Sequence, residues 1–217
     1  MVRDRPRFII IAGPNGAGKT SITGALRAHS WLDGCTYLNP DEIAESRFNG
    51  WNDPESVRQA AHYCVTYRDE ALARGESVAL ETVFSSDDKL QALRRAREAG
   101  YFVRVFFIGT DSPEINAARI TRRVMQGGHS VPIDKIIDRY KRSMTYCEVA
   151  MHWADRVYLY DNSGAKPEPQ ARTRDGMLAK TYVEPLHAWA QRIVDAFKAD
   201  TMNSSDSDDE DETRLKL

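Results

Sequence analysis

A short apolar run followed by a glycine-rich loop, residues 7–21, limits the folds open to this chain more than any other stretch. The run from Phe8 to Ile11 is apolar and rich in β-branched side chains, which is typical of a strand buried on both faces of a parallel sheet. Residues 13–20 then match the pattern G-x-x-x-x-G-K-[ST] at every fixed position. The segment therefore predicts a strand, a phosphate-binding loop and a helix that begins near Lys19.

The loop carries the groups that hold a nucleotide and its metal ion. Its glycines allow several backbone N–H groups to point at one anion, and the start of the following helix adds partial positive charge. Lys19 can reach the β and γ phosphates, and the Thr20 hydroxyl can ligate Mg²⁺. A turn that binds nothing is disfavoured, because the motif has its strand and its helix. The expected cofactor-binding residues are Gly13, Pro14, Asn15, Gly16, Ala17, Gly18, Lys19, Thr20 and Ser21.

Composition places the chain among soluble globular proteins. It has 217 residues, of which 29% are charged and 41% hydrophobic, enough for one α/β domain with a sizeable core. No apolar run approaches the ~20 residues that span a bilayer, so we expect no membrane contact. The three cysteines have no C-x-x-C spacing, which favours reduced thiols in the cytoplasm and no zinc site.

Strands alternate with helices along most of the chain, which predicts a doubly wound, mainly parallel sheet. The expected strands are 8–11, 36–38, 77–80, 101–108 and 155–160, followed by a hairpin at 165–182. The expected helices are 19–29, 41–48, 54–74, 86–99, 111–125, 132–152 and 184–198. Residues 1–200 then form a single domain, in which the region of about 112–152 is a helical lid.

Charge is unevenly distributed between this domain and the C-terminal end. The whole chain carries −2, but residues 201–217 hold six acidic and two basic side chains and contribute −4. The remaining 200 residues are mildly positive, which suits a phosphate-rich ligand better than a nucleic acid. Residues 203–212 are acidic and of low complexity, which favours a disordered tail. The alternative is a tail that competes with phosphates for the basic site.

Two carboxylates follow predicted strands and are candidates for chemistry. Asp41 and Glu81 stand at the carboxyl ends of strands, where open parallel sheets bind their ligands. Asp41 is the candidate base for a substrate hydroxyl, or it only caps the helix that it heads. Glu81 is placed to hold Mg²⁺ through water or to grip the substrate, or it only faces solvent. The hydroxyls of Thr82 and Ser85 lie beside it in the chain and share that ambiguity.

A third group of candidates lies on the predicted helix 111–125 and just after it. Arg119 shares a helix face with Arg122 and Arg123, because they are three or four residues apart. With the glycine pair that follows, they resemble a lid that closes over phosphates, where arginine stabilises the charge of phosphoryl transfer. The alternative is a solvated charged face. His129 in the same loop and Arg139 on the next helix are further candidates for substrate contact.

In order and spacing, these motifs resemble the zeta toxin family of P-loop kinases. The matching stretches are 11–21, 37–44, 80–85, 118–120, 122–124, 127–132, 139–140, 155–156 and 160–164. The glycine loop alone is common to many families. Its order and spacing relative to the glycine-glycine-histidine stretch of the lid are more specific.

The resemblance implies a P-loop kinase fold and an enzyme that uses ATP and Mg²⁺. Well-known members phosphorylate a sugar hydroxyl of UDP-N-acetylglucosamine, so a nucleotide sugar is the first expectation for the acceptor. Some members are held inactive by a small helical antitoxin, which makes such a protein a candidate partner. Two other functions stay open: a nucleotide-dependent regulatory ATPase without an acceptor, and a catalytically weak partner protein.

The resemblance also implies roles for the residues that match the family motifs. Lys19 and Thr20 would serve the phosphates and the metal ion, and Asp41 would be the general base. Glu81 would lie in the substrate and metal region. The three arginines of the predicted lid helix would take part in catalysis.

Overall fold

The computed structural model describes residues 5–125 and 131–214, with side chains as far as Thr201. Within these residues the centre is a seven-stranded sheet in the order β2-β3-β1-β4-β5-β6-β7. Strands β1 to β5 run parallel, and β6 and β7 join the edge antiparallel, which confirms the doubly wound, mainly parallel sheet and the hairpin. The strands are β1 (Arg7–Ala12), β2 (Thr36–Leu38), β3 (Val78–Thr82), β4 (Phe102–Gly109), β5 (Arg156–Asp161), β6 (Glu168–Arg174) and β7 (Met177–Thr181).

Helices connect the parallel strands, and their starts follow local capping chemistry. Asp53 precedes Pro54 and accepts a hydrogen bond from the Ser56 backbone N–H at 3.0 Å, which starts α3, one of the two longest connecting helices, where the sequence predicted it. None of the described helices is long and apolar enough to cross a bilayer. The helices are α1 (Lys19–Arg27), the 3₁₀ turn η1 (Ser30–Leu32), α2 (Pro40–Arg47), α3 (Pro54–Arg74), α4 (Asp87–Glu98), α5 (Pro113–Met125), α6 (Ile133–Trp153) and α7 (Ala188–Arg214).

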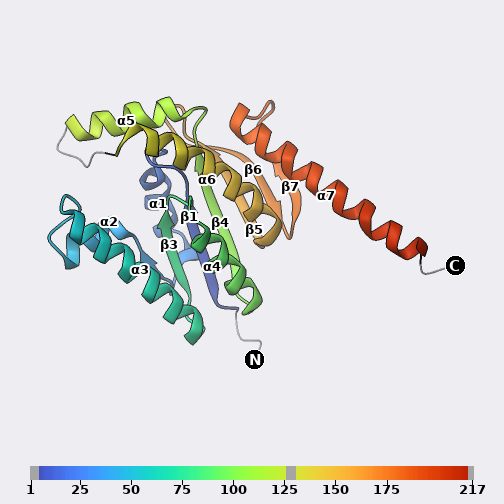
Figure 1. Cartoon of the computed structure of the whole chain (residues 1–217), viewed down its shortest axis with the longest axis horizontal. Helices are drawn as coiled ribbons and strands as arrows, with labels where there is room; N and C mark the ends of the chain where they lie inside the picture. Colours follow the sequence, from blue (N-terminus) through green and yellow to red (C-terminus); the bar gives the residue numbers. More distant parts are fainter. Residues whose placement is uncertain (1–4, 126–130, 215–217) are drawn as a thin grey trace.

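The central strand β1 divides the core into two layers. Phe8 and Ile10 pack on one face of the sheet with residues of α3, α4, α6 and α7. Ile9 and Ile11 face the other side, where α1 and η1 cover them. All four side chains are at most 1% exposed, as expected for a strand buried on both faces. Figure 1 shows β1 between β3 and β4, so the loop after it lies at the middle of the sheet's carboxyl edge.

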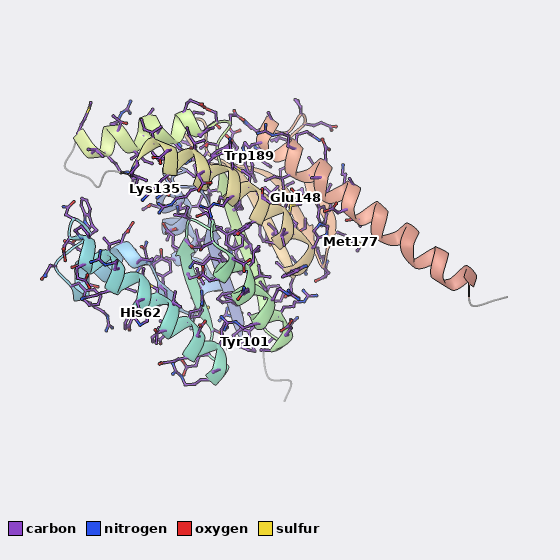
Figure 2. All side chains as sticks on the ribbon, viewed as in Figure 1. His62, Tyr101, Lys135, Glu148, Met177 and Trp189 are labelled. Carbon is purple, nitrogen blue, oxygen red and sulfur yellow. The ribbon has the colours of Figure 1, made fainter. Side chains whose placement is uncertain are left out.

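The last helix departs from the prediction. α7 does not end at Lys198 but continues to Arg214, through much of the segment 201–217 that the sequence predicts as disordered. Its first part is anchored in the core by Trp189, labelled in Figure 2, and by Phe197. Beyond Lys198 the sequence has no glycine or proline, so no local signal ends the helix. Figure 1 shows this part of α7 running beyond the body of the protein. Disorder of the segment stays a prediction.

Candidate functional site

The phosphate loop connects β1 to α1 at the carboxyl edge of the sheet. α1 begins at Lys19, as the sequence predicts. The Lys19 ammonium donates hydrogen bonds to the carbonyl oxygens of Gly13, at 2.9 Å, and Pro14, at 3.4 Å. Thr20 and Ser21, in the first turn of α1, are exposed. The loop therefore holds its cation against its own carbonyl groups and leaves two hydroxyls open to a ligand.

Two buried asparagines that the sequence analysis did not single out as site residues hold the backbone of this loop. Asn116 of α5 donates from Nδ2 to the carbonyl oxygen of Asn15 at 2.7 Å. Asn162, directly after β5, donates from Nδ2 to the carbonyl oxygen of Ala17, also at 2.7 Å. The two asparagines are 0% and 6% exposed. They keep the loop in one shape by contacts from distant parts of the chain.

The glycines of the loop make room for these asparagines. A Cβ atom on Gly16 would lie 2.5 Å from the carbonyl oxygen of Asn116, and one on Gly18 would lie 2.2 Å from Nδ2 of Asn162. Both glycines also have positive φ angles, of 78° and 83°. Asn162 follows a strand at the ligand-binding edge, so its position in the chain was a usable signal. Asn116 lies within an amphipathic helix and gave no signal.

Glu81 lies at the end of β3, level with Ile11 of β1 in the parallel register. Its Oε2 atom accepts hydrogen bonds from the Thr23 hydroxyl at 2.8 Å and from the Tyr37 hydroxyl at 2.9 Å. Burial and then the charge of Glu81 raise the pKa of Tyr37, so the phenol keeps its proton and stays a donor. The carboxylate is therefore partly buried and oriented by two donors, unlike a strand-end group that only faces solvent.

Asp41 lies on the first turn of α2 and does not cap it. The cap is Asn39, whose Oδ1 accepts hydrogen bonds from the backbone N–H of Asp41, at 2.9 Å, and of Glu42, at 3.5 Å. Pro40 takes the first helical position. The capping alternative for Asp41 was wrong, because the asparagine two residues earlier already satisfies these donors. The Asp41 side chain is exposed and free of that structural duty.

The charges of the site converge on Lys19. Burial lowers the pKa of Lys19, the carboxylates of Glu81 and Asp41 raise it, Arg123 lowers it, and the net direction is downward. These three charged groups come from β3, α2 and α5, yet all act on the same ammonium. The fold therefore brings together a phosphate-binding lysine, two carboxylates and an arginine that are far apart in the sequence.

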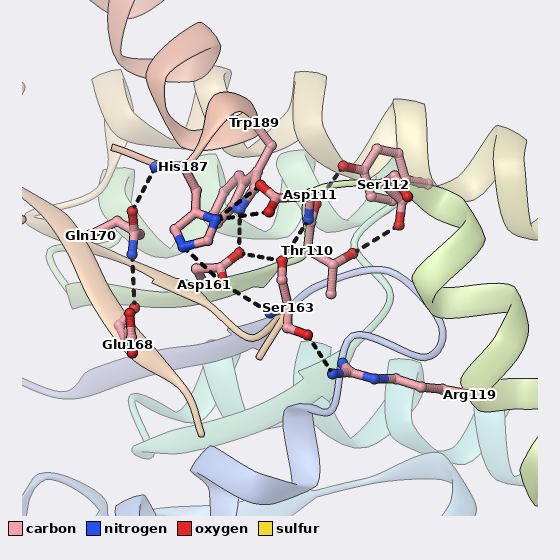
Figure 3. A network of polar contacts seen from close by, with 11 residues as sticks. Thr110, Asp111, Ser112, Arg119, Asp161, Ser163, Glu168, Gln170, His187 and Trp189 are labelled. Atoms are coloured by element: carbon pink, nitrogen blue, oxygen red, sulfur yellow. Dashed lines mark hydrogen bonds and ion pairs between the residues drawn. The ribbon is translucent and has the colours of Figure 1, made fainter. Parts of the chain in front are cut away.

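The arginines of α5 divide into two kinds. Arg119 donates from Nη2 to the carbonyl oxygens of Ser163 and Gly164, both at 3.3 Å, in the turn after β5 (Figure 3). Arg122 and Arg123 are exposed in the last turns of the helix. The region predicted as a lid contains the helices α5 and α6, and its role as a lid stays a prediction. Arg119 is already engaged by the turn, whereas Arg122 and Arg123 are exposed.

The remaining candidates lie around the loop. Arg139 of α6 donates to the side-chain Oδ1 of Asn15 at 3.2 Å, so it contacts the phosphate loop directly. The Thr82 hydroxyl accepts a hydrogen bond from the Phe84 backbone N–H at 3.3 Å and turns the chain after β3. Ser85 is partly buried in the same connection. His129 lies outside the described residues.

A parallel sheet of this order with a phosphate loop after β1 defines a P-loop fold of the small-molecule kinase type. The chain belongs to the zeta toxin family, because the family model described as Zeta toxin matches residues 1–166. The match ends in the connection between β5 and β6. The antiparallel hairpin and α7 lie beyond the residues that the family model matches.

Individual proteins resemble this chain in sequence or in fold. The chain is 29% identical over 134 residues to a Haemophilus influenzae protein, covering 62% of this chain and 92% of that one. The PezAT toxin-antitoxin structure of Streptococcus pneumoniae matches with a TM-score of 0.54 at 14% identity, covering 92% of this chain and 88% of the other. The complex of AvrRxo1-ORF1 and -ORF2 with ATP matches with a TM-score of 0.59 at 15% identity, covering 82% of this chain and 61% of the other. At these identities the structural likeness establishes the fold.

Proposed function

We propose that this protein is a kinase that transfers the γ-phosphate of ATP to a hydroxyl of a small molecule, with a nucleotide sugar such as UDP-N-acetylglucosamine as the acceptor. The observation that carries the proposal is the convergence of Asp41 and Glu81 on Lys19 at the mouth of the phosphate loop. A loop that only bound a nucleotide and its metal ion would need the lysine and one carboxylate for the metal, but not a second carboxylate from another element. Membership of the zeta toxin family supports the same reaction class.

The loop and its neighbours would bind the nucleotide phosphates. The Lys19 ammonium would exchange its bond to the Gly13 carbonyl for the β and γ phosphate oxygens. The Thr20 hydroxyl and the Glu81 carboxylate are hard oxygen donors of the kind that Mg²⁺ prefers, and they would hold the ion directly or through water. When bound, the ion neutralises charge on the phosphates. Arg139 would keep Asn15, and with it the loop, in place.

The exposed groups at the rim would carry the transfer step. Asp41 would accept the proton of the acceptor hydroxyl as its oxygen attacks the γ-phosphorus, because it is exposed and not used as a cap. Arg122 and Arg123 would approach the transferred phosphoryl group and stabilise its equatorial oxygens. Arg119 would fix the turn after β5 beside the nucleotide. Thr82, Ser85 and His129 remain candidates for acceptor contact.

A second candidate function is control through a protein partner. The PezAT structure is that of a toxin-antitoxin system, and AvrRxo1-ORF1 is seen in a complex with ORF2. By analogy, a small antitoxin-like protein would bind this chain and block its site. A regulatory ATPase without a small-molecule acceptor is the remaining alternative, in which Asp41 would position water.

One incubation, together with a binding test against a candidate partner protein, separates these functions. The purified chain is mixed with γ-labelled ATP, Mg²⁺ and either UDP-N-acetylglucosamine or a small-molecule extract, and the labelled products are separated. We expect label on a nucleotide sugar. Label that appears only as free phosphate at a rate no acceptor changes indicates the regulatory ATPase. Tight binding of a partner protein without turnover indicates the partner function.

A further inference from the structure

We propose that His187 is a positioning residue for the nucleotide site, which locks the turn at residues 161–164 against the phosphate loop. The inference rests on the proposed nucleotide site and adds to it a residue from outside the family-matched region. His187 lies in the connection between β7 and α7, beyond residue 166 where the family match ends. The hairpin and α7 would then serve to hold the site.

The imidazole ring of His187 lies between two carboxylates, as Figure 3 shows. Its Nδ1 atom is 2.9 Å from Oδ2 and 3.0 Å from Oδ1 of Asp111, which follows β4. Its Nε2 atom is 3.5 Å from Oδ2 of Asp161, at the end of β5. The backbone N–H of His187 also donates to the side chain of Gln170 on β6 at 3.0 Å. The ring therefore ties the C-terminal addition to the ends of two central strands.

Asp161 passes this contact to the turn. Its Oδ1 atom accepts hydrogen bonds from Trp189 Nε1 and from the Ser163 hydroxyl, both at 2.8 Å. Its Oδ2 atom accepts the backbone N–H of Ser163 at 2.8 Å. The Asp161 side chain is only 3% exposed, so water cannot replace these partners easily. The carboxylate fixes the backbone of the turn at Ser163.

The turn at residues 161–164 contacts both the phosphate loop and Arg119 of α5. Asn162 donates from its backbone to Gly109 at 2.9 Å and from its side chain to the phosphate-loop carbonyl of Ala17. The next two carbonyl oxygens accept from Arg119. Three successive contacts therefore link His187 to the phosphate loop: ring to Asp161, carboxylate to Ser163, and the adjacent Asn162 to the loop.

The two carboxylates suit a protonated ring. A neutral imidazole donates from one nitrogen only and carries no charge, whereas the imidazolium ion can donate from Nδ1 to Asp111 and form an ion pair with Asp161. Burial lowers the pKa of His187, but the hydrogen bond with Asp111 and the charges of Asp161, Asp111 and Glu168 outweigh it, and the pKa is raised. Because the pKa of His187 is raised, the ring is charged and the lock is complete at pH values below the ordinary pKa of histidine. The charge and the lock are lost as the pH rises through the raised pKa of the folded protein.

A metal ion is a poorer occupant of this cluster. One ligand atom from each of Asp111, Asp161 and His187 lies within 4.8 Å of the others, a spacing that a cation could use. However, three hydrogen bonds from Trp189 and Ser163 already use most of the acceptor capacity of Asp161, and its Oδ2 atom also faces the His187 ring. The geometry favours the charged ring over the ion.

Three variants test the lock. His187→Gln loses the charge, His187→Lys keeps a positive charge, and His62→Gln, on the exposed surface of α3 far from the network in Figure 2, is the matched control. Two measurements are made on each full-length protein: amide hydrogen exchange of residues 161–164 without nucleotide, and affinity for a fluorescent ATP analogue with Mg²⁺ at pH 6.0 and pH 8.5.

In the wild type we expect slow exchange at pH 6.0 and an affinity that falls at pH 8.5. His187→Gln should exchange roughly tenfold faster in the turn and bind the analogue about fivefold more weakly at pH 6.0, the lower end of coupling between sites. His187→Lys should restore the slow exchange and the affinity, and its affinity should no longer fall between pH 6.0 and pH 8.5 as it does in the wild type. His62→Gln should match the wild type in both measurements.

Equal exchange and affinity in His187→Gln and the wild type would overturn the inference. A rise in melting temperature with Zn²⁺ or Mn²⁺ that Asp111→Asn abolishes would also overturn it, in favour of a metal site. If the wild type does not bind the analogue while the exchange difference remains, the proposed function fails and the lock on the turn stands.

Discussion

The floor and the rim of the candidate site are built in different ways. At the floor, the phosphate-loop backbone is held by the side chains of Asn116 and Asn162, which are buried and fully determined by the fold. At the rim, Asp41, Arg122 and Arg123 are exposed at the first turn of α2 and the last turns of α5. The proposed phosphate site is therefore preorganised by packing, whereas the proposed transfer step would depend on exposed charges. Floor variants should therefore change stability and affinity, and rim variants mainly the rate.

The largest effect is expected at Lys19, which lies in the phosphate loop at the floor and interacts with the charges of Asp41 and Arg123 at the rim. Lys19→Ala removes the charge that would meet the β and γ phosphates, so phosphoryl transfer should fall by at least about 10³-fold. The fold should persist, because within the part of the chain that the structure describes the Lys19 ammonium donates only to carbonyl oxygens of its own loop. The measurements are the transfer rate from labelled ATP and the circular dichroism spectrum. Lys198→Ala, an exposed lysine on α7, is the control, and near-normal turnover in Lys19→Ala contradicts the kinase proposal.

The rim makes the next prediction. Asp41→Asn should keep α2 intact, since Asn39 is the cap, and should leave ATP affinity and melting temperature nearly unchanged. It removes the proton acceptor, so acceptor phosphorylation should fall by about 10² or more, the usual contribution of a general base. Glu45→Gln on the exposed face of the same helix is the matched control. A loss smaller than about tenfold would remove Asp41 from the base role and make Glu81 the next candidate.

The floor makes the opposite prediction. Asn116→Ala deletes the donor to Asn15 and leaves that partly buried carbonyl without this partner, which should cost about 1–3 kcal/mol of unfolding free energy. Nucleotide affinity should fall with it, because the loop loses one of its side-chain supports. Thermal melting with and without an ATP analogue measures both effects.

Asn52→Ala, at an exposed position before α3, is the control for that experiment and should change neither quantity. If Asn116→Ala melts like the wild type, the loop is held by its own backbone and the contrast between floor and rim fails. If it loses rate but not stability or affinity, Asn116 belongs functionally with the rim.

The same contrast explains how far the sequence predicts the site. β1, the loop and the start of α1 are set by local patterns: an apolar strand, glycines and a motif with fixed spacing, so the sequence located them correctly. Strand-end rules also nominated Asp41 and Glu81, because the carboxyl ends of parallel strands meet at one edge. The roles proposed for both stay predictions.

Part of what the sequence did not show depends on partners distant along the chain. Asn116 bonds to a residue 101 positions earlier, and its polarity on an amphipathic helix resembles ordinary surface. Arg119 was expected at the lid and is bound to the turn after β5. The cap of α2 is a local matter: the alternative role for Asp41 was to cap this helix, whereas Asn39 is the cap, and the propensity of either side chain does not decide between them.

The smallest effect is expected at the C-terminal end, far from both floor and rim. Deleting residues 201–217 should change the melting temperature and the transfer rate little, because the side chains that anchor α7 in the core, Trp189 to Phe197, all precede the cut.

The sequence favours disorder in this segment, since residues 203–212 are poor helix formers and place acidic charge near a helix C-terminus, whereas α7 continues through them. Far-UV circular dichroism distinguishes a disordered segment from a helical one: if the segment is disordered, its deletion leaves the helical signal almost unchanged. A fall in melting temperature of more than about 4 °C, roughly 1 kcal/mol for a domain of this size, would show that the segment docks on the body. A faster reaction without the tail would instead support its competition with phosphates for the basic floor.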